Sequence, residues 1–166
     1  MAELKVEIKS DLLPIDEAKL IEYKGDHPSK MLGQIPDWIR ETLRVTSSDF
    51  FEDVIKWDRA GPTLEFYGEW RGRFPKDRYS TYWLWIRLHG YQSAKDLTGT
   101  AHITIKGWLM TKMTFNSELE KMLRWPFLKY FYMDQRKVYE REGKERLLEL
   151  ESRFRSFLGL PATAEF

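Results

Sequence analysis

The stretch from Asp49 to Phe115 decides the fold, and it contains TLEFYGEWRGRF (63–74), YSTYWLWIRLHGY (79–91) and GTAHITIKGWLMTKMTF (99–115). Along each segment one set of alternate residues is mainly apolar, and alternate residues of a strand point to opposite faces of a sheet. Together with residues 49–58, these segments predict four consecutive strands of an antiparallel meander.

The alternation assigns one face of the meander to the inside of the protein. Inner residues must oppose inner residues, so the pattern also restricts how neighbouring strands pair. We expect the following large side chains to be buried together on this face: Trp57, Phe66, Trp70, Leu84, Ile86, Ile103 and Ile105.

The turns suggest a pairing for two of the hairpins. In the first hairpin we expect Asp58 opposite Thr63, which would bring Asp53 to the inner face opposite Gly68. In the last hairpin one allowed pairing places His89 opposite His102. The same pairing places Trp83 opposite Trp108 and Trp85 opposite Lys106.

Shorter elements precede the meander and a long helix follows it. Residues 4–9 and 19–24 read as strands, and the apolar spacing from residue 28 to 43 predicts two short helices, or one helix kinked at Pro36. Ser117 and Glu120 form a capping box at the start of a C-terminal helical stretch. Pro126 predicts a break or kink in that stretch.

Length and composition limit the remaining choices. The 166 residues predict a single domain, 1–166, and the net charge of +1 gives no general attraction to nucleic acid or anionic membranes. Because the chain has no cysteine, thiolate metal sites and cysteine catalysis are excluded. No apolar run reaches the length of a membrane span and no signal peptide stands at the start, which predicts a cytoplasmic protein. A charged fraction of 32% with one Asn and three Gln is typical of thermophiles.

This order of elements resembles that of the helix-grip superfamily, the START-related and polyketide-cyclase-like proteins. The resemblance is carried by the helical segment around Gly33 and Pro36, the strands between Asp49 and Phe115, and the capped helix from Ser117. It implies an α+β fold in which a curved antiparallel sheet, two short helices and a long C-terminal helix enclose an apolar cavity. The chain departs from the family pattern, with two strands before the helices and four after them.

The resemblance also implies a first hypothesis for function, a protein that binds an apolar or aromatic small molecule between the sheet and the C-terminal helix. Asp53 would be the polar anchor, because an acid on an inner face needs a partner. The other expected ligand-binding residues are Trp57, Phe66, Trp70, Tyr82, Leu84 and Ile105. An enzyme of the cyclase or hydrolase type is a further possibility on this cavity, although no acid–base pair in the sequence supports it.

The outer face of the meander suggests a second hypothesis, a structural or assembly protein. Trp83, Trp85 and Trp108 lie on this face, and we expect the C-terminal segment or the second subunit of a homodimer to cover them. Arg and Lys stems stacked on the rings are the simpler alternative. A stacking platform for single-stranded nucleic acid is a third alternative, which Glu65 and Glu69 on the same face argue against.

No residue pattern indicates a metal site or a bound cofactor. His89 and His102 are expected neighbours, but a zinc site needs three or four protein ligands and the spacing fixes no third one. We therefore interpret them as surface histidines. No catalytic residue is assigned.

Overall fold

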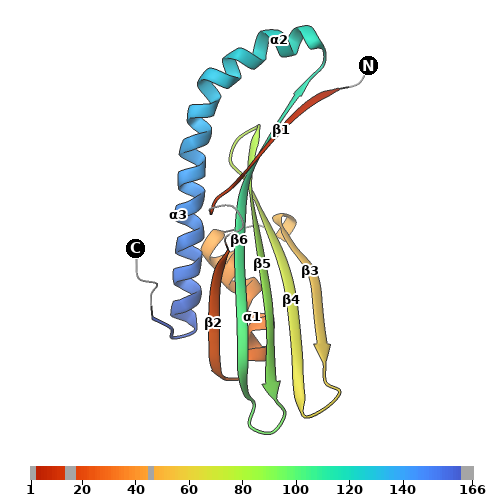
Figure 1. The fold of residues 1–166 in the computed structure, drawn as a ribbon, viewed down its shortest axis with the longest axis vertical. Coiled ribbons are helices and arrows are strands. Elements are labelled where there is room, and N and C mark those ends of the chain that lie inside the picture. Colours follow the sequence, from red (N-terminus) through yellow and green to blue (C-terminus); the bar gives the residue numbers. More distant parts are fainter. Residues whose placement is uncertain (1–2, 14–17, 45–46, 162–166) are drawn as a thin grey trace.

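The computed structural model describes residues 3–13, 18–44 and 47–161 (Figure 1). Residues 1–2 and 162–166, the two ends of the expected single domain, lie outside the described residues. The described part is an α+β fold with a curved antiparallel sheet and a long C-terminal helix, as the sequence predicts. Its strands are β1 (Leu4–Asp11), β2 (Lys19–Asp26), β3 (Phe50–Asp58), β4 (Thr63–Pro75), β5 (Ser80–Ser93) and β6 (Thr98–Phe115).

The helical elements lie in two parts of the chain. Between β2 and β3 are two 3-10 turns, η1 (Pro28–Lys30) and η2 (Ser47–Asp49), and one helix, α1 (Met31–Leu43), which contains Pro36. Of the two alternatives, two short helices or one helix through Pro36, the structure has the single helix, preceded by a 3-10 turn. After β6 come α2 (Glu118–Phe127), the π-helical segment η3 (Leu128–Tyr132) and α3 (Met133–Phe157).

Within the described residues six strands form one open sheet in the order β1-β6-β5-β4-β3, and β2 also pairs with β6. β6 holds three neighbours because it is 18 residues long. On one side, β2 pairs with residues 98–105 and β1 with residues 108–115, while β5 occupies the other side. The two N-terminal strands thus form one interrupted edge of the sheet.

The last hairpin has the register that the alternation allows. His89 lies opposite His102, Trp83 opposite Trp108 and Trp85 opposite Lys106.

In the first hairpin the observed register differs from the expected one by two residues, since Asp58 pairs with Glu65 and not with Thr63. The connecting loop is wider than a tight turn because the Asp58 carboxylate accepts the backbone N–H of Ala60 at 2.9 Å and Gly61 has φ of 134°.

The inner face of the sheet is covered by α1 and α3, and Figure 1 shows both helices beside the sheet. The two helices also touch each other, with the ring centroids of Trp38 and Phe154 5.2 Å apart. Trp57 is the exception to the expected burial. It stays 47% exposed because β3 is the edge strand of the sheet. The expected inner residues that are buried are Phe66, Trp70, Leu84, Ile86, Ile103 and Ile105.

The C-terminal helical stretch is broken next to Pro126, as predicted. α2 ends at Phe127, and a π-helical segment separates it from α3. The capping box is formed as expected, with the Ser117 hydroxyl accepting the Glu120 N–H at 3.1 Å. In Figure 1 the chain bends at this break, so that α2 projects as an arm beyond the main body of the sheet.

Candidate functional site

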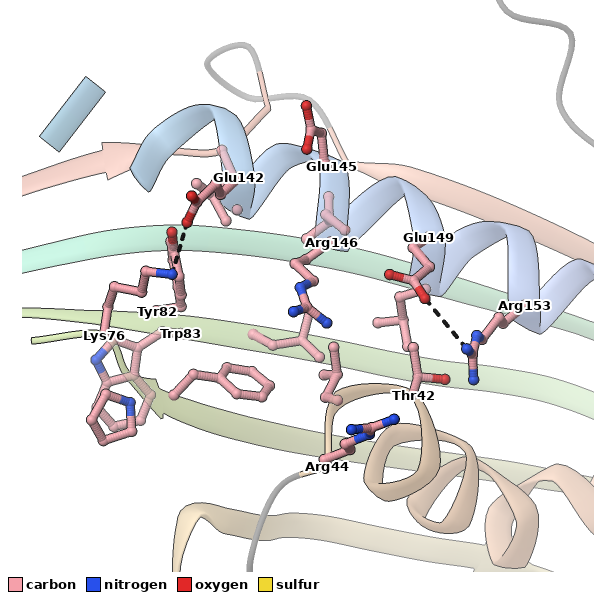
Figure 2. Close-up of a pocket in the computed structure, with 18 of the residues that line it drawn as sticks. Thr42, Arg44, Lys76, Tyr82, Trp83, Glu142, Glu145, Arg146, Glu149 and Arg153 are labelled. Carbon is pink, nitrogen blue, oxygen red and sulfur yellow. Dashed lines mark ion pairs between the residues drawn. The ribbon is translucent and has the colours of Figure 1, made fainter. Parts of the chain in front are cut away.

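A cleft of about 930 Å³ opens between α3, the C-terminal end of α1 and the ends of β4 and β5 (Figure 2). Its volume lies within the range of small-molecule sites, which are concave and partly preformed. The cleft lies between sheet and C-terminal helix, where the first hypothesis expects a ligand. Its lining includes Leu12, Thr42, Leu43, Arg44, Phe74, Lys76, Tyr82, Leu84, Glu142, Gly143, Arg146, Leu147, Glu149, Leu150 and Arg153.

The cleft lies between the C-terminal end of α1 and the part of α3 that approaches the sheet closely. α1 ends at Leu43, and Arg44 at its C-cap has a left-handed conformation with φ of 52°. On α3, Gly143 allows a close approach to the sheet, because a Cβ there would lie 2.7 Å from both Leu12 and Tyr82. The cleft is the wider space between the end of α1 and the close approach at Gly143.

The base of the cleft is apolar. Leu84 of β5 and Leu147 and Leu150 of α3 are at most 5% exposed. Leu43 and Phe74 are partly buried and pack against the same core. This base can bury an aliphatic or aromatic body of a ligand.

Thr42 is the one buried polar side chain in the described part of the chain with an unpaired atom. The residue is 4% exposed, and its Oγ1 has no hydrogen-bond partner among the described residues. A buried hydroxyl without a protein partner costs free energy, so Thr42 Oγ1 is a candidate for a hydrogen bond to a water molecule or to a ligand in the cleft.

Charged side chains surround the opening of the cleft. Lys76 pairs with Glu142 at 2.8 Å and Arg153 with Glu149 at 3.4 Å, as Figure 2 shows. Arg146 has no ion pair with any residue that the structure describes, and Figure 2 shows its side chain extending from α3 towards the sheet.

Arg44 lies opposite, at the end of α1, and it too lacks an ion pair within the described ranges. Among the acids of the lining, Glu145 points away from the sheet in Figure 2. Glu41 of α1 also lines the cleft, so the lining holds as many acids as bases. Arg44 and Arg146 are the two guanidinium groups without an ion pair in the described ranges, and they are the groups that an anionic part of a ligand could contact.

Tyr82 contributes its ring and not a free hydroxyl. Its Oη donates to the backbone carbonyl of Tyr139 at 2.6 Å. Burial, aided by the negative charge of Glu142, raises the pKa of Tyr82, so the phenol stays protonated near neutral pH.

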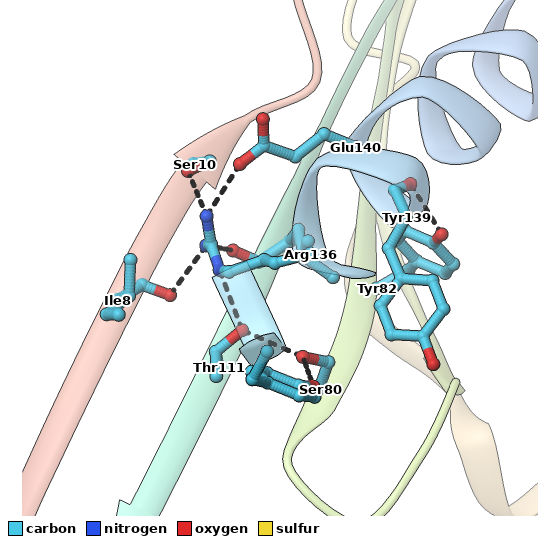
Figure 3. Close-up of polar contacts among 10 residues, drawn as sticks. Ile8, Ser10, Ser80, Tyr82, Thr111, Arg136, Tyr139 and Glu140 are labelled. Atoms are coloured by element: carbon cyan, nitrogen blue, oxygen red, sulfur yellow. Dashed lines mark hydrogen bonds and ion pairs between the residues drawn. The ribbon is translucent and has the colours of Figure 1, made fainter. Parts of the chain in front are cut away.

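A polar network fixes α3 to the sheet at the end away from α1 (Figure 3). Arg136 is 5% exposed, and burial lowers its pKa, an effect that Glu140 partly offsets. All five guanidinium donors have acceptors, which is the full capacity of an arginine. The acceptors are Thr111 Oγ1 at 2.9 Å, Ser10 Oγ at 2.7 Å, Glu140 Oε1 at 2.6 Å and the carbonyls of Ile8 at 3.1 Å and Leu109 at 3.2 Å. With its donors satisfied, Arg136 positions the helix and leaves nothing for a ligand.

Tyr132 extends this network to the turn before β5. Its hydroxyl lies 2.8 Å from Asp77 Oδ2 and 2.6 Å from Ser80 Oγ. Burial alone would raise the pKa of Asp77, but the backbone N–H groups of Tyr79 and Ser80 and the Tyr132 hydroxyl outweigh it, so the pKa lies below its usual value.

The structure brings only two of the seven expected ligand-binding residues, Tyr82 and Leu84, into the cleft. Phe66, Trp70 and Ile105 belong to the filled core, at most 1% exposed. Trp57 lies on the open edge of the sheet.

The expected inner position of Asp53 is wrong. The pairing of β3 with β4 shifts between Glu52 and Val54, and this irregularity turns Asp53 towards Arg71, whose guanidinium contacts both carboxylate oxygens at 2.6 and 3.0 Å. Asp53 is therefore not an anchor for a ligand in the cleft.

Thr42, Arg44 and Arg146 were not found from the sequence. Thr42 follows Ile35, Trp38 and Ile39 at helical spacing, so a polar residue on an apolar stripe was a usable signal. Arg146 lies in a highly charged stretch, where the spacing of residues does not show which charged side chain faces the cleft.

The aromatic rings on the outer face of the sheet stack on one another, and basic side chains lie over them. Trp83, Trp85 and Trp108 are each half-buried. Trp83 stacks on Phe51 and on Trp108, with ring centroids 6.3 and 6.4 Å apart. The cations over these rings are Lys9, Arg71, Arg73, Arg87 and Lys106.

The C-terminal helix packs on the inner face, so the expectation that it covers these tryptophans is wrong. Stacked Arg and Lys stems, the simpler alternative, are confirmed. Cover by a second subunit stays a prediction.

The histidines pair with carboxylates on the surface. His89 Nε2 lies 2.9 Å from Glu65, and His102 Nδ1 lies 3.7 Å from Glu22. Across residues 3–13, 18–44 and 47–161, no group of three or more metal-ligating side chains occurs.

Comparison with protein-family models, with curated proteins and with solved structures found no match to this chain. None of the helices that the structure describes is long and apolar enough to cross a membrane.

Proposed function

We propose that this protein binds a small molecule with an apolar or aromatic body and an anionic group in the cleft between α3 and the sheet. The observation that carries the proposal is the buried, unpaired hydroxyl of Thr42 beside an open cleft with an apolar base. The proposal assumes a helix-grip-like arrangement, in which a ligand lies between a curved sheet and a long helix.

The apolar part of the ligand would occupy the base formed by Leu84, Leu147 and Leu150. These side chains come from both walls, β5 and α3, so a ligand between them would lose water from two sides. Because these leucines are already at most 5% exposed, the apolar contribution to affinity would come mainly from the ligand's own apolar area, at about 25 cal/mol per Å² buried.

The anionic group would lie at the opening, between Arg146 on α3 and Arg44 on α1. A guanidinium can donate two parallel hydrogen bonds to a carboxylate, which gives orientation as well as energy. Thr42 Oγ1 would donate or accept one further hydrogen bond and lose its unpaired state. Arg44 and Arg146 thus distinguish an acid from a neutral analogue of the same size.

Two aromatic probes test this. Anilinonaphthalene sulfonate is anionic, and phenyl-naphthylamine has a similar ring system without the charge. We expect saturable fluorescence enhancement with both. In Arg146→Gln the sulfonate probe should bind about tenfold more weakly, the equivalent of one lost charge-assisted hydrogen bond, while binding of the neutral probe changes little.

Two variants serve as controls. Arg141 is exposed on the same helix and does not line the cleft, so Arg141→Gln should bind both probes as the wild type does. Leu123 is 71% exposed on α2, and Leu123→Glu reports any probe bound there. Equal affinity of the sulfonate probe for the wild type and Arg146→Gln, or loss of binding only in Leu123→Glu, would contradict the proposal.

A further inference from the structure

The projecting arm formed by α2 and η3 carries six of the thirteen large apolar side chains that are exposed among the described residues. Six large apolar side chains on it are between 62% and 71% exposed. They recur every three to four residues, so they lie along one side of the helical arm. We call them the arm face: Leu119, Met122, Leu123, Phe127, Tyr130 and Phe131.

The arm is held in place, so this exposure does not come from a loosely attached segment. Its opposite side has a separate small core, in which Leu128 is 6% exposed and packs with Met113 and Phe115 of β6. Arg124 contacts Glu120 at 2.5 Å and the Tyr79 hydroxyl at 3.2 Å. One side of the arm is therefore docked on its own sheet, and the arm face remains open.

The π-helical segment keeps the aromatic end of the arm face together. Phe127 and Phe131, on either side of the start of η3, have ring centroids 4.9 Å apart. A monomer seldom leaves a contiguous apolar patch of this kind in water, and such patches mark interaction sites.

The charges beside the arm face favour a second copy of this chain as the partner. The first turn of α2 carries the exposed acid Glu118, and the far end of the arm carries the exposed base Lys129. Two copies of the arm packed antiparallel would place each Glu118 near the Lys129 of the other copy. A strongly basic or strongly acidic partner would meet charges of both signs, whereas a second copy with reversed direction meets complementary ones.

We propose that the arm face binds the arm face of a second copy of this chain, in antiparallel orientation about a two-fold axis. Such an interface is isologous, uses the same residues twice and closes at a dimer. It buries the exposed aromatic rings at its centre, where aromatic residues contribute most to association. The proposal is independent of ligand binding in the cleft.

The test is molar mass by light scattering and sedimentation from about 1 to about 100 μM, the range over which a dimer of micromolar Kd dissociates. The wild type should approach twice the chain mass of 19.9 kDa. Leu123→Glu should be a monomer with an unchanged circular dichroism spectrum. Leu148→Glu, at a partly exposed leucine of α3 outside the arm, should remain a dimer.

A charge exchange tests the orientation. Glu118→Lys and Lys129→Glu should each weaken the dimer, and the double variant should restore its affinity. A monomeric wild type at the highest concentration, or an unchanged mass for Leu123→Glu, would overturn the proposal. A monomeric wild type that instead binds phosphatidylcholine vesicles through Leu123 would assign the arm to a lipid surface and overturn it as well.

Discussion

Thr42 is the residue where stability and binding are expected to oppose each other. Its hydroxyl is buried without a partner, and an unpaired buried hydroxyl costs about 1–3 kcal/mol. Valine has nearly the same shape and no hydroxyl. We therefore expect Thr42→Val to raise the free energy of unfolding by about 1 kcal/mol in urea denaturation.

The same substitution should weaken the binding of the sulfonate probe, because the hydrogen bond to the ligand is lost. A matched control is Thr111→Val, since Thr111 is also fully buried but its hydroxyl accepts from Arg136. Thr111→Val should lower the stability. A loss of stability in both variants would show that Thr42 has a partner in the folded protein.

Asp77 should make the stability depend on pH in the acid range. Its pKa in the folded protein lies below the unfolded value of about 3.9, because the N–H groups of Tyr79 and Ser80 and the Tyr132 hydroxyl stabilise the carboxylate against the opposing effect of burial. Its stabilising contribution is therefore complete above the unfolded pKa. The contribution is lost as the pH falls through the folded pKa.

Urea unfolding at several pH values checks this expectation. Asp77→Asn should be less stable than the wild type at pH 7, and the difference should shrink below about pH 4. A difference that stays constant down to about pH 2 would show that the Asp77 carboxylate is not stabilised in the folded state.

At the scale of the elements, alternation in the sequence determines the faces of the strands better than their pairing. The register of β5 with β6 is one that the parity of Trp83 and Trp108 allows. In the first hairpin the parity is right and the register is shifted by two residues, because the side chain of Asp58 and the conformation of Gly61 widen the loop. A local irregularity next to Asp53 changes the parity of β3 from Glu52 back to Phe50, so that Phe51 stacks on Trp83 of the outer face. No pattern in the sequence reveals it.

The candidate site was harder to predict than the fold for a related reason. Burial can be inferred from apolar spacing, as for Leu84, but a cleft depends on where α1 stops and how closely α3 approaches the sheet. Gly143 allows α3 to approach the sheet closely, and α1 ends at Leu43 before it covers this part of the sheet. Neither follows from the alternation of apolar and polar residues.

Two glycines on the inner face of the sheet test the packing of the elements. A Cβ at Gly90 would lie 2.4 Å from both Phe66 Cζ and the backbone oxygen of Thr100, whereas at Gly72 the nearest atom is 3.9 Å away. Gly90→Ala should therefore cost about 1–3 kcal/mol of unfolding free energy. Gly72→Ala should change it by less than about 1 kcal/mol, because the added Cβ would make ordinary van der Waals contacts and alanine restricts the unfolded chain. Equal effects of the two substitutions would contradict the packing described for this face.

At the scale of the whole molecule, the C-terminal helical stretch serves two separate regions. α3 forms one wall of the cleft, and Arg136 fixes it to β1 and β6. The arm, which contains the break near Pro126, projects away from the cleft (Figure 1). A dimer through the arm would leave both clefts open, so assembly and ligand binding can be measured independently.

The most direct test of the proposed binding is methyl NMR of the wild-type protein titrated with anilinonaphthalene sulfonate. This measurement separates the cleft from the arm in a single experiment, because both regions carry methyl groups. If the cleft binds the anion, the methyl signals of Thr42, Leu84, Leu147 and Leu150 shift together and saturate at one ligand per chain, while those of Leu119 and Leu123 stay in place. Shifts confined to Leu119 and Leu123, with the cleft signals unchanged, would contradict the proposal.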